Sequence, residues 1–184
     1  MTSINTNTIT QYDRVIDACK DLYTRKAADY GTSWRVLRPI SIVDQIYIKA
    51  WRIRQIQENK TQLVDDPIEN EFVGIVNYSI IALIQHFLPA GTSIDLSAEQ
   101  AKAYYEAQAS SVKELMLRKN HDYGEAWREL SQESFVDLIL VKLLRIRQII
   151  ANDGSVSVSE GADANFADIV NYGIFALIRI GEGA

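Results

Sequence analysis

Acidic, amide and aromatic side chains recur at helical spacing in this sequence, in a combination that suits a phosphorylated ligand. Asn165, Asp168 and Tyr172 stand at i, i+3 and i+7, which places them on one helix face. A related stretch earlier in the chain has Glu71 and Gly74 where this one has Asn165 and Asp168. Carboxylates that converge without histidine suit Mg²⁺, which takes oxygen ligands together with substrate phosphates. Such an ion can activate water, so phosphoanhydride hydrolysis is the chemistry to expect.

A second polar pattern follows the helical period at residues 42–58 and again at 135–152. At 100° per residue, an arc of about 80° holds Asp44, Ile48, Arg52 and Gln55, and its counterpart holds Asp137, Val141, Arg145 and Gln148. The flanking positions are apolar, so we expect the stripe to be at least partly buried, where charges need partners. Two outcomes stay open: an Asp–Arg–Gln network that holds the two stretches in register, or a ligand site where cations meet phosphate. The spacing Ser41-x-x-Asp44 and Ser134-x-x-Asp137 also fits a capping box.

Further cations lie near these stripes. Lys49 and Lys142 fall within the apolar arc, where each either reaches solvent or contacts an anion at the edge of a cleft. The pattern K-x-x-DYG-x-x-WR occurs twice, as Lys26, Asp29, Tyr30, Gly31, Trp34, Arg35 and as Lys119, Asp122, Tyr123, Gly124, Trp127, Arg128. Glycine and tryptophan here suit a helix cap and a packing anchor. An aromatic ring beside arginine can also stack on a nucleobase and grip phosphate.

These paired motifs belong to a tandem duplication. Residues 26–56 and 119–149 align without a gap and are identical at 17 of 31 positions, and the segments that begin at Ile75 and Ile169 share 8 of 10. The copies run over about 10–88 and 103–181, with a linker that carries Pro89 and Gly91 between them. We therefore divide the chain into repeat 1 (1–90) and repeat 2 (91–184), packed as one globular unit.

Each repeat is predicted to form three helices, over 9–28, 42–58 and 68–88 and then over 98–121, 135–152 and 162–180. Ser97-x-x-Gln100 indicates a capping box, and Gly31 and Gly124 indicate left-handed helix ends. Strand alternation is weak throughout. The predicted fold is all-α, a six-helix bundle with pseudo-two-fold symmetry in which the repeats complete each other's core.

Composition excludes several function classes. Hydrophobic residues make up 47% of the 184 positions and the net charge is −5, with 19 basic and 24 acidic residues. An ordinary globular composition without a basic excess argues against general nucleic-acid binding. One cysteine, Cys19, and two histidines exclude a disulfide framework and a cysteine-based zinc site. Apolar runs are too short to cross a bilayer, so we expect a cytoplasmic protein without membrane contact.

The motifs K-x-x-DYG-x-x-WR, S-x-x-D-x-x-x-x-K-x-x-R-I-R-Q and D-I-V-N-Y resemble the nucleotide modification associated domain 1 family, a domain of unknown function, in two tandem copies. More distantly, the layout looks like the all-α MazG-like nucleoside triphosphate pyrophosphatases. Those enzymes place paired acids on neighbouring helices around Mg²⁺. This resemblance implies a metal site in repeat 2 formed by Asp137, Glu160 and Asp168, with Asp137 and Asp168 as the catalytic pair.

The sequence thus predicts a nucleotide-binding protein, with Mg²⁺-dependent pyrophosphohydrolysis of a (deoxy)nucleoside triphosphate as its reaction. The partner is a small nucleotide or another phosphorylated ligand, and the duplication either replaces a homodimer or sits within a homo-oligomer. Residues predicted to bind substrate are Lys26, Tyr30, Arg35, Lys49, Arg52, Lys119, Asp122, Tyr123, Trp127, Arg128, Lys142, Arg145 and Asn171. The alternative is a non-catalytic helical interaction or ligand-binding module whose repeated charges are structural.

Overall fold

The computed structural model describes residues 6–157 and 160–183, and in this part of the chain it is built from helices alone. Repeat 1 contains α1 (Thr6–Tyr30), α2 (Pro39–Asn59) and α3 (Ile68–Phe87), and repeat 2 contains α4 (Ala98–Tyr123), α5 (Gln132–Ala151) and α6 (Ala162–Gly181). A short 3₁₀ helix follows the first helix of each repeat, η1 (Ser33–Val36) and η2 (Ala126–Glu129). The prediction of an all-α bundle of two three-helix repeats is confirmed. None of the described helices is long and apolar enough to cross a membrane.

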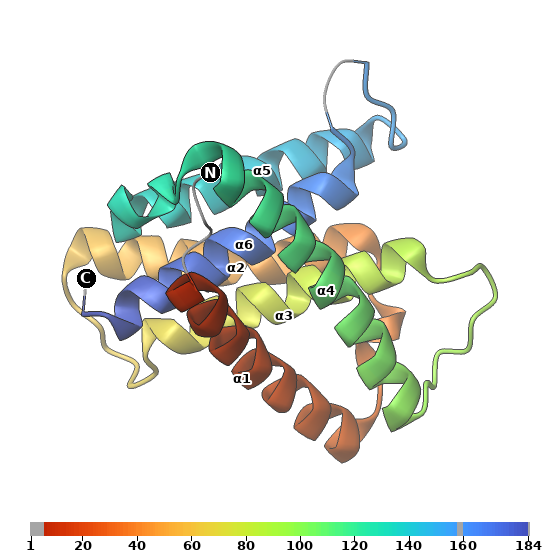
Figure 1. Cartoon of the computed structure of the whole chain (residues 1–184). Coiled ribbons are helices and arrows are strands. Elements are labelled where there is room, and N and C mark those ends of the chain that lie inside the picture. Colours follow the sequence, from red (N-terminus) through yellow and green to blue (C-terminus); the bar gives the residue numbers. More distant parts are fainter. Residues whose placement is uncertain (1–5, 158–159, 184) are drawn as a thin grey trace.

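The six helices form three layers, and each layer takes one helix from each repeat (Figure 1). α3 and α6 pack against each other in the middle and form the most extensive helix pair. α2 and α5 cover one side of this pair, and α1 and α4 cover the other. Every layer therefore joins equivalent elements of the two repeats, as a pseudo-two-fold axis requires. Burial follows from this arrangement, since the middle helices are apolar over most of their surface.

Local signals explain most helix ends. Ser97 and Gln100 form the predicted capping box at the start of α4. Gly31 and Gly124 follow α1 and α4 with φ of 68° and 58°, a conformation that glycine adopts without strain. The predicted capping boxes at Ser41 and Ser134 are wrong because both helices begin earlier. Arg38 precedes α2 without a side-chain cap and Pro39 opens it, while Ser131 caps α5.

Two buried asparagines link the repeats across the core. The Asn77 amide on α3 donates to the Cys19 carbonyl of α1 at 3.0 Å and accepts from the Tyr105 hydroxyl of α4 at 2.8 Å. The Asn171 amide on α6 makes the equivalent contacts, to the Val112 carbonyl at 3.5 Å and from the Tyr12 hydroxyl at 2.8 Å. Each asparagine thus bonds to one helix of its own repeat and one of the other. Burial raises the pKa of Tyr12 and Tyr105, so both hydroxyls stay protonated donors.

The arginines of the two WR motifs hold equivalent chain connections. Arg35 donates to the carbonyls of Ser93 and Thr92 at 3.3 and 2.9 Å, and so fixes the linker between the repeats. Arg128 donates to Gln11 near the start of the first helix at 2.8 Å and to Glu182 after the last helix at 3.1 Å. The linker in one half and the two ends of the helical chain in the other therefore occupy corresponding places.

We predict that Tyr105→Phe lowers the free energy of unfolding by about 1–3 kcal/mol, because it leaves the buried Asn77 oxygen without a donor. Urea unfolding followed by circular dichroism measures the change. Tyr123→Phe is the control, since the Tyr123 side chain is 72% exposed and should change stability by less than about 0.5 kcal/mol. Equal effects of the two variants would contradict the role given to this bond.

Candidate functional site

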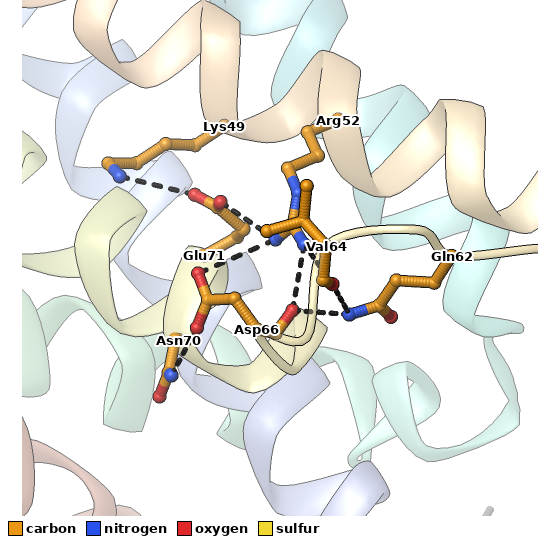
Figure 2. Close-up of polar contacts among 7 residues, drawn as sticks. All are labelled: Lys49, Arg52, Gln62, Val64, Asp66, Asn70 and Glu71. Carbon is orange, nitrogen blue, oxygen red and sulfur yellow. Dashed lines mark hydrogen bonds and ion pairs between the residues drawn. The ribbon is translucent and has the colours of Figure 1, made fainter.

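One carboxylate in repeat 1 gathers two cations from the neighbouring helix. Glu71 in the first turn of α3 accepts from Lys49 Nζ at 3.1 Å and from Arg52 Nη1 at 2.9 Å (Figure 2). Its side chain is only 11% exposed, so this pairing compensates its charge where water gives little help. Arg52 also donates to the Asp66 carbonyl at 2.8 Å, which ties the loop before α3 to α2.

A pocket of about 700 Å³ opens beside this cluster, entirely within repeat 1. Lys26 from α1, Lys49 from α2 and Glu71 and Gly74 from α3 line it. Lys26 makes no hydrogen bond or ion pair with the residues that the structure describes. The pocket is therefore lined by one cation without a counter-ion among the described residues and by a second that shares Glu71 with Arg52.

Aromatic side chains form much of the pocket wall. Tyr23, Tyr30, Trp34 and Tyr78 all line it, and Tyr30 is 58% exposed at its edge. Trp127, the equivalent of Trp34, is buried in repeat 2 because it stacks flat on Phe175 with 4.3 Å between ring centroids. In repeat 1 the position on α3 that corresponds to Phe175 is Ile81, and both Trp34 and Ile81 line the pocket.

Repeat 2 arranges its charges differently. Asp168 on α6 accepts from Lys119 Nζ at 2.5 Å through one oxygen and from Lys142 Nζ at 2.6 Å through the other. Burial lowers the pKa of Lys119, but the hydrogen bond and charge of Asp168 outweigh it, so the pKa is raised. Burial and the Asp168 charge likewise raise the pKa of Tyr172. Both lysines predicted to meet phosphate in repeat 2 are thus paired with a carboxylate of the protein.

A second pocket of about 650 Å³ lies at the end of α5 and is lined by Arg145, Glu160 and Asn165 among others. Arg145 has no ion-pair or hydrogen-bond partner among the described residues, unlike its equivalent Arg52. Asn165 replaces the carboxylate of repeat 1 and donates to the Gly161 carbonyl at 2.8 Å. Lys119, Lys142 and Asp168 do not line this pocket, so its position differs from that of the pocket in repeat 1.

The expected partial burial of the polar stripe on the second helices is met at Arg52, which is 24% exposed, but not at the two aspartates. Asp44 is 51% exposed and Asp137 is 62% exposed. Asp44 accepts from Arg147 at 2.7 Å and Asp137 from Arg54 at 3.4 Å, so two reciprocal bridges join α2 to α5. The expected register network therefore exists, but its arginines are not Arg52 and Arg145. Sequence reasoning missed Arg54 and Arg147, although both recur in the R-I-R-Q motif.

The predicted Mg²⁺ ligands Asp137, Glu160 and Asp168 are not arranged as a metal site. No group of three or more His, Cys, Asp or Glu residues within 6–157 and 160–183 could hold a metal ion. Asp137 pairs with an arginine of the other repeat, and Asp168 is enclosed by two lysines. Since a lysine ammonium competes directly with a cation for carboxylate oxygens, these residues do not fit Mg²⁺.

Other predicted substrate contacts have structural partners instead. Arg35 and Arg128 hold the linker and the ends of the helical chain, and Asn171 is buried with both amide atoms bonded. Trp127 packs beneath Phe175 and carries the Arg128 guanidinium on its ring at 4.3 Å. These four residues are therefore not available to a ligand.

The exposed residues of the DYG motif in repeat 2 lie away from both pockets. Tyr123 is 72% exposed and lines neither pocket, and Asp122 pairs with His121 at 3.0 Å. Of the predicted set, Lys26, Tyr30 and Lys49 meet at one pocket, and Arg52 reaches its acid. Glu71, which was not among the predicted site residues, pairs with two cations of this group. The sequence signal for Glu71 was the difference between the repeats, which have Glu71 and Gly74 in one and Asn165 and Asp168 in the other.

The comparison with family models supports the duplication. The model of nucleotide modification associated domain 1 matches residues 26–86 and 119–180, which is more than half of the chain. The chain belongs to this family. Searches of curated proteins and of solved structures found no match. Both family segments begin at the lysine of the DYG motif and end in the third helix of a repeat, so they contain the charged residues of both arrangements described above.

We predict that Asp168→Asn lowers the free energy of unfolding by about 2–4 kcal/mol at pH 7, because two lysines lose a nearly buried partner. Asp44→Asn breaks an exposed bridge and should cost less than about 1 kcal/mol. Because the folded pKa of Lys119 is raised above 10.5, the advantage of wild type over Asp168→Asn should persist below pH 10.5 and shrink above it. Denaturant unfolding at several pH values measures both effects, and equal costs for the two variants would contradict this account.

Proposed function

We propose that this protein binds a nucleotide in the pocket of repeat 1. The observation that supports the proposal is the combination of two lysines and four aromatic side chains around about 700 Å³, a volume typical of small-molecule sites. Membership of the nucleotide modification associated domain 1 family agrees with it. Phosphate would take the position between Lys26 and Lys49, and the base would lie against the aromatic wall.

Charge favours an anionic ligand at this place. Glu71 carries one negative charge and already serves both Lys49 and Arg52, whereas Lys26 is unpaired among the described residues. A phosphate oxygen between the lysines would supply the missing negative charge through charge-assisted hydrogen bonds. The carboxylate also keeps Lys49 in place before the ligand arrives, which lowers the cost of ordering a flexible side chain.

The proposal covers binding and leaves out the hydrolysis expected from the sequence. Asp66 and Glu71 line the pocket, but both are within ion-pair distance of Arg52, at 3.7 and 2.9 Å. Neither carboxylate is free for a cation. We therefore expect a nucleoside monophosphate to bind with equal affinity in the presence of Mg²⁺ and in the presence of EDTA, because lysines rather than a metal would hold its phosphate.

We predict that Lys26→Ala weakens nucleotide binding at least tenfold, because it removes the unpaired cation. Isothermal titration with each deoxynucleoside monophosphate measures the affinity. Lys102→Ala is a matched control, since Lys102 is exposed on α4 and does not line the pocket. Absence of binding by wild type to every nucleotide, with and without Mg²⁺, would refute the proposal.

A second variant tests the base contact separately from the phosphate contact. We predict that Tyr30→Ala weakens the binding of a nucleoside monophosphate by about 5- to 150-fold and leaves the binding of inorganic pyrophosphate unchanged. The reason is that stacking on a base contributes about 1–3 kcal/mol and pyrophosphate has no ring. Tyr123→Ala, the equivalent change in repeat 2, should alter neither titration. Equal losses for both ligands in Tyr30→Ala would place the base elsewhere.

A further inference from the structure

The two repeats carry the same three cations but place the carboxylate that bonds to two of them one helical turn apart. Lys26, Lys49 and Arg52 correspond to Lys119, Lys142 and Arg145. In repeat 1 the acid is Glu71, which takes the second lysine and the arginine. In repeat 2 it is Asp168, three positions further along than the equivalent of Glu71, and it takes the two lysines. The position of Asp168 corresponds to Gly74.

The Asp168 carboxylate lies between Lys119 and Lys142 and bonds to both, as a phosphate group would. Each of its two oxygens accepts from a different ammonium, at 2.5 and 2.6 Å, which are short distances typical of charge-assisted bonds. The Asp168 side chain is 7% exposed and Lys142 is 12% exposed, whereas Lys119 is 42% exposed, so the carboxylate covers the inner lysine more than the outer one. Repeat 2 shows the arrangement in which two lysines share one bridging anion.

Repeat 1 lacks this anion because Gly74 has no side chain. The Lys49 side chain lies across the glycine, with its Cε atom 2.7 Å and its Nζ atom 3.1 Å from the place where a Cβ atom would stand. Gly74 and both lysines line the pocket of repeat 1, whereas the equivalent Asp168, Lys119 and Lys142 do not line the pocket at the end of α5. The place that corresponds to the carboxylate of repeat 2 thus holds the flexible end of Lys49, and no acidic side chain reaches it from position 74.

We propose that Asp168 is a built-in counter-ion that occupies the phosphate position of repeat 2, so that the chain has one phosphate site, between Lys26 and Lys49 in repeat 1. This inference rests on the proposed function for the site in repeat 1. According to this inference, one position of the repeat determines whether its phosphate site is open or closed. That position is Gly74 in repeat 1 and Asp168 in repeat 2. Converting either residue to the other should convert the site.

The test counts inorganic pyrophosphate bound per chain by isothermal titration. Pyrophosphate is a suitable probe because Trp127 and Phe175 fill the place of a base in repeat 2. Wild type should bind one equivalent. Asp168→Gly should bind two equivalents. In phosphate-free buffer its melting temperature should be lower than that of wild type. Added pyrophosphate should raise the melting temperature of Asp168→Gly more than that of wild type. If Asp168→Gly does not fold, Asp168→Asn takes its place, with the same gain of a second equivalent expected.

The reverse change closes the open site. Gly74→Asp should bind pyrophosphate at least tenfold more weakly than Gly74→Asn, which adds the same bulk without the charge. Both substitutions displace only the flexible end of Lys49, so both should fold. One equivalent in both wild type and Asp168→Gly, or equal affinities of Gly74→Asp and Gly74→Asn, would overturn the inference while the proposed function stands. Binding by Asp168→Gly but not by wild type would refute the proposed function and the phosphate site in repeat 1, and would leave only the role of Asp168 as a counter-ion.

Discussion

The two buried asparagine amides set the geometry on which the candidate site depends. Asn77 bonds to the Cys19 carbonyl, and Lys26 follows Cys19 by seven residues, two turns along the same face of α1. Gly74 precedes Asn77 by three residues on α3, so this bond fixes which turn of α3 meets which turn of α1. The equivalent bond of Asn171 places Asp168 beside Lys119. A buried amide is costly unless every polar atom is bonded, and this requirement prevents the helices from sliding.

In each repeat one carboxylate on the third helix bonds to two of three cations, and the position of that carboxylate determines which cation is left over. In repeat 1 Glu71 leaves Lys26, which borders the larger pocket. In repeat 2 Asp168 leaves Arg145, which borders the other pocket. A shift of one helical turn in a single acid therefore gives two halves of the same fold different electrostatics. The helices themselves need not move, because Glu71 and Gly74, like Asn165 and Asp168, lie on one face.

The sequence predicted the fold well because the duplication provides its own comparison: helices, glycine ends and the Ser97 cap depend on local patterns. The lysines of the site were also predicted, since both repeats keep them. The partners of the charges were not. Helical spacing grouped Asp44 with Arg52, but the side chain that reaches Asp44 is Arg147 of the other repeat. Spacing within one helix states which residues share a face, whereas the packing of α2 on α5 decides what that face meets. For the same reason spacing could not show that Asp168, expected as a Mg²⁺ ligand, pairs with lysines from other helices.

The hydrogen bonds of Arg35 and Arg128 have a consequence for the order in which the two repeats are connected. Gln11 and Glu182 are bonded to each other at 2.7 Å and to Arg128, at the place where repeat 1 has the linker held by Arg35. A short connection there, with the linker cut, would give a circular permutant that begins at α4 and ends at α3 and loses no packed helix pair. Either repeat could therefore come first in the polypeptide, since the two repeats associate through side chains of the interior and not through the linker.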